Sequence, residues 1–357
     1  MTATMATGDV ASASRLRYPL QSEPGVGDGS AVAVTPGLLW LRMPLFAALP
    51  WINVWALKEE GGWAIVDTGL HSPNTIAAWQ IAFAGAMHGA PVSRVVVTHM
   101  HPDHCGMAGW IAERFKVPLW MSRLEYLSCR LMAADTGRSA PAEGVAFYRS
   151  AGWDEEAIER YKTRFGSFGE MIYPLPASYH RLADRDALRL GGRDWMVVVG
   201  SGHSPEHACL YCPELKLLIS GDQVLPRISS NVSVYPTEPD ADPLDDWLKS
   251  LADIKRRIPD DVLVLPAHNS PFNGLHARID ELSKSHLEGL ARLEDALAAA
   301  PKRAVDVFSA LFARPIKPGV LGMATGEAIA HLNYLTMRGR AIRELDAEGV
   351  WWWRLNR

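Results

Sequence analysis

The 357-residue chain has little cysteine, with only Cys105, Cys129, Cys209 and Cys212. Four cysteines are too few for the disulfide framework of a small secreted domain, so we expect a reduced, cytoplasmic protein. The N-terminal sequence MTATMATGDVASASRLRYPL lacks the apolar stretch that a secretory signal requires. No run of about 18 apolar residues occurs, and the sequence therefore predicts no membrane span.

Positive charge is also scarce. Lys and Arg number 36 against 40 Asp and Glu, which gives a net charge of −4 at pH 7. A general nucleic-acid binder normally carries a basic surplus, so this balance argues against nucleic acid and favours a small-molecule substrate. The length exceeds what one core usually serves, and we expect one large domain with an appendage.

Short apolar strands alternate with helices, which predicts an α/β domain over residues 31–274. Residues 1–30 are rich in Ala, Ser, Thr and Gly, and we expect a flexible N-terminal tail there. Residues 122–176 have helical patterns only, so we expect a helical insertion that covers the substrate as a lid. Residues 231–236, NVSVYP, alternate like a strand. Residues 275–357 predict helices followed by a hairpin turned at AEG, which is the outline of a winged helix.

Three histidines and one carboxylate follow directly after a β-branched run in VVVTHMHPDHCG: they are His99, His101, Asp103 and His104. Three more candidates follow other predicted strands, in GHSPEH, SGD and PAH: they are His203, Asp222 and His268. Loops at strand ends present functional groups on a rigid sheet. Five imidazoles and two carboxylates suit two divalent ions, and these donor types fit Zn, Fe, Mn or Co.

Each ion can be given its own set of ligands. We assign the first ion to His99, His101 and His203. We assign the second ion to Asp103, His104 and His268. Asp222 is our candidate for a carboxylate that bridges the two ions, because such a pair can hold both a nucleophile and the attacked oxygen. Asp103 and Asp222 are also the candidates for proton transfer.

These motifs resemble those of the metallo-β-lactamase superfamily. THMHPDHCG matches its HxHxDH signature, and VDTG, GHSPEH, SGD and PAH occur in the superfamily's order between about residues 35 and 274. The resemblance implies an αββα sandwich with the metals at one edge of the two sheets. The C-terminal region, with AIAHLNYLTMRGRAIRE and a Trp-rich hairpin, is similar to the winged-helix extension of a branch that includes β-lactamase-like endoribonucleases.

The resemblance also implies an activity. We expect a dinuclear hydrolase, glyoxalase II-like in its chemistry, in which a metal-bridged hydroxide attacks a thioester, ester or lactone of a small organic acid. Zinc is the expected metal, with iron or manganese as alternatives. True zinc β-lactamases carry a Cys where this chain has Asp222, so antibiotic hydrolysis is not expected. Two alternatives stay open: a phosphodiesterase or endoribonuclease, and a mononuclear iron dioxygenase.

Other residues are expected to support the site. Asp67 in VDTG braces the metal loop in the resembling family, and His207 lies four residues after His203, so we expect both to orient ligands. Arg227, Ser229 and Asn231 follow Asp222 and are candidates for substrate contact. Arg227 suits a carboxylate or phosphate, although a plain surface arginine is an equal alternative.

The predicted winged helix has a weak nucleic-acid signal. Its candidate recognition helix, MATGEAIAHLNYLTMRG, carries a single Arg, whereas a helix that reads a duplex is normally richer in Lys and Arg. We therefore expect this region to close the substrate cleft or to pair two copies of the chain as a homodimer.

Overall fold

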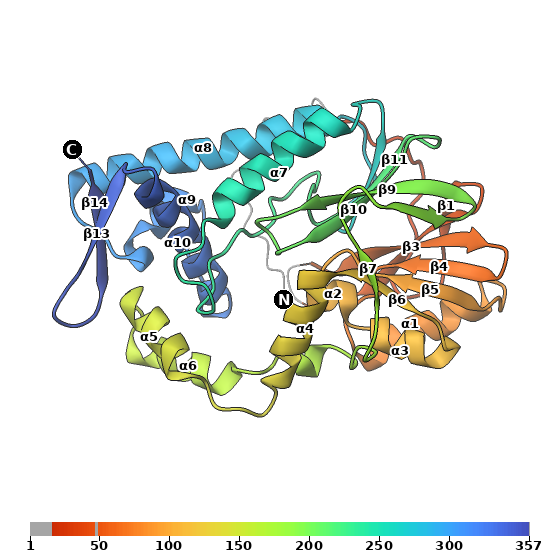
Figure 1. The fold of residues 1–357 in the computed structure, drawn as a ribbon, viewed down its shortest axis with the longest axis horizontal. Coiled ribbons are helices and arrows are strands. Elements are labelled where there is room, and N and C mark those ends of the chain that lie inside the picture. The colour runs from red at the N-terminus through yellow and green to blue at the C-terminus, as the bar shows by residue number, and fades with distance from the viewer. Residues whose placement is uncertain (1–15, 47–48, 357) are drawn as a thin grey trace.

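The computed structural model describes residues 16–46 and 49–356. Two sheets stack against each other in the right half of the view in Figure 1. The seven-stranded sheet contains, in order, β1 (Val32–Thr35), β2 (Leu38–Pro44), β3 (Trp51–Glu59), β4 (Gly62–Val66), β5 (Val92–Val96), β6 (Leu119–Ser122) and β7 (His180–Leu182). The five-stranded sheet contains, in order, β12 (Leu263–Pro266), β11 (Leu217–Gly221), β10 (His207–Cys212), β9 (Arg193–Gly200) and β8 (Ala187–Leu190). The strands that precede the histidine motifs therefore lie in both sheets.

Helices cover the outer faces of both sheets. On the seven-stranded sheet these are α1 (Pro73–Ala84), α2 (Pro102–Cys105) and α3 (Ala108–Phe115). On the other side, α7 (Pro243–Arg257) packs against β9, and α8 (Leu275–Ala299) packs along α7. Strand β9 shows the layering, because Val197 belongs to the core between the sheets and Val198 to the core under the helices. The fold is the predicted αββα sandwich.

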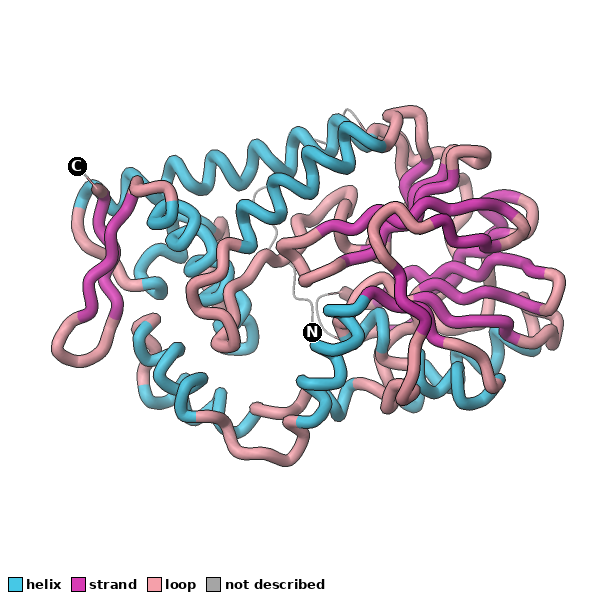
Figure 2. Tube along the Cα trace, viewed as in Figure 1, coloured by secondary structure: helices cyan, strands magenta, loops and turns pink. Residues whose placement is uncertain are grey.

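The C-terminal region continues from α8 as short helices and a hairpin. Its elements are η3 (Ala304–Val307), α9 (Phe308–Leu311), η4 (Pro318–Val320), α10 (Leu321–Met337), β13 (Ala341–Leu345) and β14 (Trp351–Leu355). Figure 2 shows the hairpin standing apart from the two large sheets, at the far end of α8. Trp353 is fully buried against the helices. Every residue of α10 from Ala324 to Asn333 is buried.

The helical insertion lies between β6 and β7. It consists of α4 (Arg123–Ala134), α5 (Ala142–Ser150), α6 (Glu155–Arg164) and one turn, η2 (Gly169–Met171). Figure 1 shows α4 leaving the sheet and α5 and α6 lying near the C-terminal region. Trp153 bridges the two, since its indole N–H donates to the hydroxyl of Thr325 on α10 at 2.8 Å. The insertion is therefore tied to the C-terminal region as well as to the sheet.

Two predicted segments differ from their expected form. Of the predicted tail, residues 1–15 lie outside the described residues, whereas the backbones of Arg17 and Asn273 exchange hydrogen bonds. Residues 231–236 were wrongly predicted as a strand. Their alternation has another cause: Val232 and Val234 are buried in the core with α7 and α10, and the N–H of Val234 donates to a carbonyl of α10. Within the described part of the chain, no helix is long and apolar enough to span a membrane.

Candidate metal centre

The seven predicted ligands meet at one edge of the two sheets, on loops that follow β5, β9, β11 and β12. One group of neighbouring donor atoms comes from His99, His101, His203 and Asp222. A second group comes from Asp103, His104 and His268. Both groups are able to hold metal ions, because within each group the donor atoms lie within 4.8 Å of one another.

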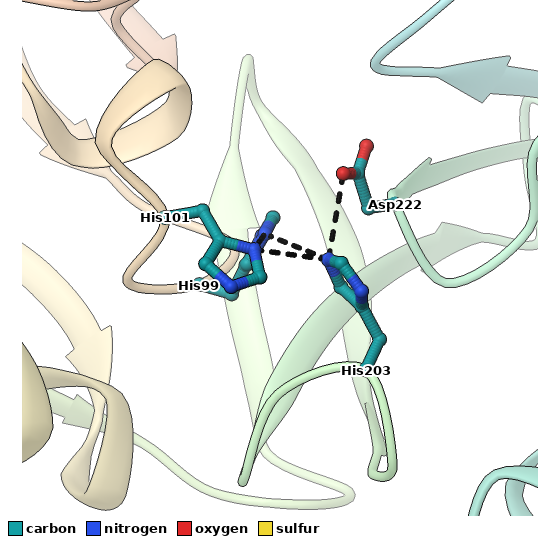
Figure 3. A group of neighbouring side chains, drawn as sticks. All are labelled: His99, His101, His203 and Asp222. Atoms are coloured by element: carbon teal, nitrogen blue, oxygen red, sulfur yellow. Dashed lines mark hydrogen bonds and ion pairs between the residues drawn. The ribbon is translucent and has the colours of Figure 1, made fainter. Parts of the chain in front are cut away.

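The first group points its donor atoms toward one centre, as Figure 3 shows. Nδ1 of His101 lies 2.9 Å from Nε2 of His99 and 3.0 Å from Nε2 of His203. Nε2 of His203 lies 3.3 Å from Nε2 of His99 and 3.4 Å from Oδ2 of Asp222. A tetrahedral ion with ligands at about 2.1 Å separates them by roughly 3.4 Å. The spacing of this group therefore fits a single divalent ion.

The second group converges on the other oxygen of Asp222. Nε2 of His104 and Nε2 of His268 each lie 3.5 Å from Oδ1 of Asp222, and His268 lies 3.3 Å from Oδ2 of Asp103. Nε2 of both histidines and Oδ1 of Asp222 are buried without a hydrogen-bond partner among the described residues. Such an orphaned atom costs about 1–3 kcal/mol, and an ion between these three would satisfy all of them. The residues therefore fit a second ion.

Burial and nearby charge set the protonation of the centre. Burial lowers the pKa of His99 well below its usual value, so this ring is neutral and ready to bind a metal. Burial also lowers the pKa of His104, but the carboxylates of Asp222 and Asp67 outweigh it and raise this pKa well above the usual range. Burial opposes ionisation of Asp222, yet His268 and His104 hold its pKa well below normal. An ion at the second group competes with the proton on His104.

The two residues predicted to orient ligands both contact members of the groups. Oδ2 of Asp67 lies 2.8 Å from Nδ1 of His104, and Asp67 also accepts the backbone N–H of Thr98 at 2.8 Å. Nε2 of His207 accepts the backbone N–H of Asp222 at 3.0 Å. One brace therefore fixes a ring and the other fixes the loop of the shared carboxylate.

Sequence reasoning missed other braces. Nδ1 of His203 donates to the backbone carbonyl of Asn231 at 2.8 Å, and Nδ1 of His268 lies 3.2 Å from that of Trp51. Glu125, at the base of the insertion, accepts the backbone N–H groups of Met100 and Glu206, each at 2.8 Å. Backbone carbonyls carry no sequence signal, and an acid in the first turn of a helix is usually a surface residue.

A glycine also shapes the metal loop. A Cβ at Gly106 would lie 2.3 Å from the carbonyl oxygen of Pro102 and 2.6 Å from that of Gly69. The HxHxDH loop therefore crosses the VDTG turn at a distance that only glycine permits. Gly106 ends the quoted sequence THMHPDHCG, and a glycine at that position is the sequence signal for this close approach.

The three residues predicted to contact substrate have different surroundings. Arg227 is exposed, with its guanidinium 5.3 Å from the ring centre of Tyr18. Ser229 is half-buried beside α8, and Nε2 of His286 lies 3.4 Å from its hydroxyl. The amide of Asn231 donates to Oε2 of Glu327 on α10 at 2.8 Å. Only Ser229 and Asn231 therefore contact the C-terminal region.

Comparison with known families agrees with the fold and the centre. The model of the metallo-β-lactamase superfamily matches residues 52–268. The chain belongs to the metallo-β-lactamase superfamily. A model of the metallo-β-lactamase-like C-terminal domain matches residues 290–356, so this member carries a recognised C-terminal extension.

Several similar proteins match this chain over most of its length. A β-lactamase domain protein from Burkholderia ambifaria is 38% identical, with a TM-score of 0.87 over 96% of this chain and 98% of that one. A metallo-β-lactamase family protein from Thermus thermophilus is 27% identical, with a TM-score of 0.75 over 90% of this chain and 100% of that one. A probable metallo-hydrolase, YqjP, from Bacillus subtilis (strain 168) is 23% identical over 84% of this chain and 92% of its own length. The chain is therefore a metallo-β-lactamase superfamily hydrolase whose His/Asp groups are able to bind metal ions.

Proposed function

We propose that this chain is a dinuclear metal-dependent hydrolase that cleaves a thioester, ester or lactone of a small organic acid, with zinc as the expected metal. The observation that carries the proposal is Asp222, whose Oδ2 faces the first group and whose Oδ1 faces the second. Two divalent ions held there would supply a hydroxide nucleophile at neutral pH and would polarise the attacked carbonyl.

The chain's own residues prepare this chemistry by fixing the ligands. Asp67 and the carbonyl of Asn231 hold the outer nitrogens of His104 and His203, so their inner nitrogens stay aimed at the two groups. Asp103 and Asp222 are our candidates for proton transfer after attack, because each has a carboxylate oxygen within 3.5 Å of Nε2 of His268.

The C-terminal region and the metal-binding residues both bear on the class of substrate. Helix α10, the candidate recognition helix, is buried from Ala324 to Asn333 and offers few side chains to a nucleic-acid groove. This favours a small molecule over a ribonuclease substrate. A carboxylate at position 222, where zinc β-lactamases use a thiolate, favours an acid derivative other than a β-lactam.

The test is metal reconstitution with an assay panel. Protein stripped of metal would receive zinc stepwise while hydrolysis of thioesters, lactones, aryl esters and a bis-aryl phosphodiester is followed. We expect an ester-type substrate to be cleaved as metal is restored. Asp222→Asn should stay inactive, and the exposed Asp194→Asn variant should match the wild type. Cleavage of the phosphodiester alone would contradict the proposed bond type, and oxygen consumption without hydrolysis would contradict a hydrolase.

A further inference from the structure

A second polar cluster, outside the two metal groups, lies between α8, α10 and the segment that follows β11. A small pocket there is lined by Ser229, Ser285, His286, Gly289, Arg292, Leu311, Glu327 and His331. His286, His331 and Glu327 are buried, at 5%, 3% and 6% exposure. Burying three titratable groups is costly unless they are paired or used, so the pocket needs an explanation.

The two histidines form a hydrogen-bonded chain with a fixed direction. Nδ1 of His331 lies 2.8 Å from the carbonyl oxygen of Glu327, which only accepts, so this nitrogen carries the hydrogen. Nε2 of His331 then accepts from Nδ1 of His286 at 3.3 Å. Nε2 of His286 in turn is left as an acceptor 3.4 Å from the hydroxyl of Ser229, which lies equally far, at 3.4 Å, from the carbonyl oxygen of Ser230. The chain thus ends on a serine at the pocket wall.

Arg292 is an exposed residue of α8 that lines the same pocket and brings positive charge to it. Its Nε donates to the carbonyl oxygen of Ala310 at 2.7 Å, which sets the direction of the guanidinium. Within residues 16–46 and 49–356, no carboxylate forms an ion pair with it. By contrast, Arg303 and Arg340 of the same region each pair with a carboxylate. An oriented guanidinium that has no carboxylate partner among the described residues is suited to binding an anion.

The pocket is joined to the metal centre by three consecutive residues. Ser229 lines the pocket. The hydroxyl of Ser230 donates to the carbonyl oxygen of Asp222, and the carbonyl of Asn231 accepts from His203. A molecule that fills the pocket is therefore placed beside the loop that carries the shared carboxylate.

We propose that this pocket binds a carboxylate group of the substrate, which Arg292 anchors and the hydroxyl of Ser229 hydrogen-bonds. That the bound molecule is a substrate rests on the proposed hydrolase function. The binding of a carboxylate to the pocket can be measured independently of that function. A carboxylate is the expected anion because the proposed substrate is a derivative of a small organic acid. Burial raises the pKa of Glu327 to about 7, so its neutral form is well populated and repels the ligand little.

Binding has a consequence for the histidine chain. A carboxylate only accepts hydrogen bonds, so Ser229 must turn its hydrogen away from His286 and toward the ligand. Burial lowers the pKa of His286 to about 3 and that of His331 to about 4, so both rings stay neutral near pH 7. Nε2 of His286 therefore loses its hydrogen bond from Ser229 when the carboxylate binds.

The first test is direct binding to the metal-loaded full chain with ¹⁵N-labelled histidine. Succinate should shift Nε2 of His286 toward the value of a ring nitrogen without a hydrogen bond, because Ser229 turns to the ligand, and uncharged succinamide should not. Arg292→Gln should weaken this response about tenfold or more, as expected for a lost charged hydrogen bond. Arg292→Lys should restore part of it, and Lys284→Gln, which removes an exposed charge from the same helix, should leave it unchanged. No ring response to succinate, an equal response in Arg292→Gln, or a response to inorganic phosphate alone would overturn the proposal.

The second test separates the pocket from the hydrolase proposal. Two aryl esters of equal length, one ending in a carboxylate and one in an amide, would be compared as substrates. Arg292→Gln should raise KM for the carboxylate ester about tenfold and leave the amide ester unchanged. An unchanged KM for both esters would contradict the pocket while the hydrolase stands. If the wild type cleaves neither ester but the ring response appears as expected, the hydrolase proposal fails and carboxylate binding stands.

Discussion

The chain buries two clusters of histidine, and they differ in where their nitrogen atoms point. At the metal centre, nitrogens from separate loops converge on one another and on Asp222, and Nε2 of His104 and of His268 lacks a hydrogen-bond partner among the described residues. Between α8 and α10, the rings of His286 and His331 instead bond to each other and to the carbonyl of Glu327.

This difference teaches what makes a buried histidine a metal ligand. Burial lowers the pKa of His99 and of His286 alike, so low basicity does not separate the clusters. What separates them is the carboxylate: Asp222 lies 3.4–3.5 Å from three ring nitrogens, and neither member of the α8–α10 pair has a carboxylate oxygen at such a distance among the described residues. The predictions below test this distinction.

Removing the shared carboxylate should have the largest effect. Asp222→Asn takes the charge from both groups at once, so we expect metal content to fall below one ion per chain. Activity should fall by more than about a hundredfold, the upper range for losing a residue that only orients a ligand. Elemental analysis and the hydrolysis assay check this. Two ions per chain in this variant would show that Asp222 is not a shared ligand.

Asp67→Asn should affect one group and spare the other. It weakens the hold on Nδ1 of His104, so metal affinity at the second group should fall about 10- to 100-fold. The first group, which Asp67 reaches through the hydroxyl of Thr98 beside His99, should be affected less and keep its ion. Competition with a chelator would resolve the two affinities, and an equal loss at both groups would contradict their separate bracing.

Glu327→Gln should change how stability depends on pH. Burial raises the pKa of Glu327 from 4.5 to about 7, so the stability linked to its neutral form is present below pH 4.5 and is lost as the pH rises through 7. The variant lacks this loss, so relative to wild type it should gain on the order of 2 kcal/mol between pH 5 and pH 8. Chemical unfolding at both pH values measures the difference. A constant offset between the two proteins would contradict the raised pKa.

His286→Gln should have the smallest effect on metal. The ring belongs to the α8–α10 pair, so the variant should retain the wild-type metal content although it loses a buried hydrogen bond worth about 1 kcal/mol. Elemental analysis would check this against His203→Gln, which should lose metal from the first group. Metal loss in His286→Gln would break the distinction between the clusters.

Much of the fold was predictable because its strands and motifs carry local signals. The apolar runs before His99, His203, Asp222 and His268 are strands, and the residues after them meet at one edge. Residues 231–236 defeated the same reasoning, since their alternation reflects packing of Val232 and Val234 beside α10 rather than pairing in a sheet. The periodicity of apolar residues indicates which side chains are buried, but it does not indicate which element covers them.

The candidate site likewise has one part that could be predicted from the sequence and one part that could not. The histidines of the HxHxDH motif were found from the sequence, because histidines in such a cluster have few roles besides binding metal. The carbonyl of Asn231, the acid of Glu125 and the pocket around Arg292 were not, because each depends on segments far apart in the chain. Arg227 was the arginine expected to contact substrate, and the structure places it over Tyr18, whereas Arg292, which no sequence motif marked, lines the pocket.

The central claim is that two ions share Asp222, and counting metal against activity tests it most directly. Metal-free protein would receive zinc in half-equivalent steps, with bound metal and hydrolysis measured at each step. The account predicts two ions per chain at saturation, with most of the activity returning only as the second equivalent binds. Full activity at one ion per chain, or a single tightly bound iron without hydrolysis, would contradict it.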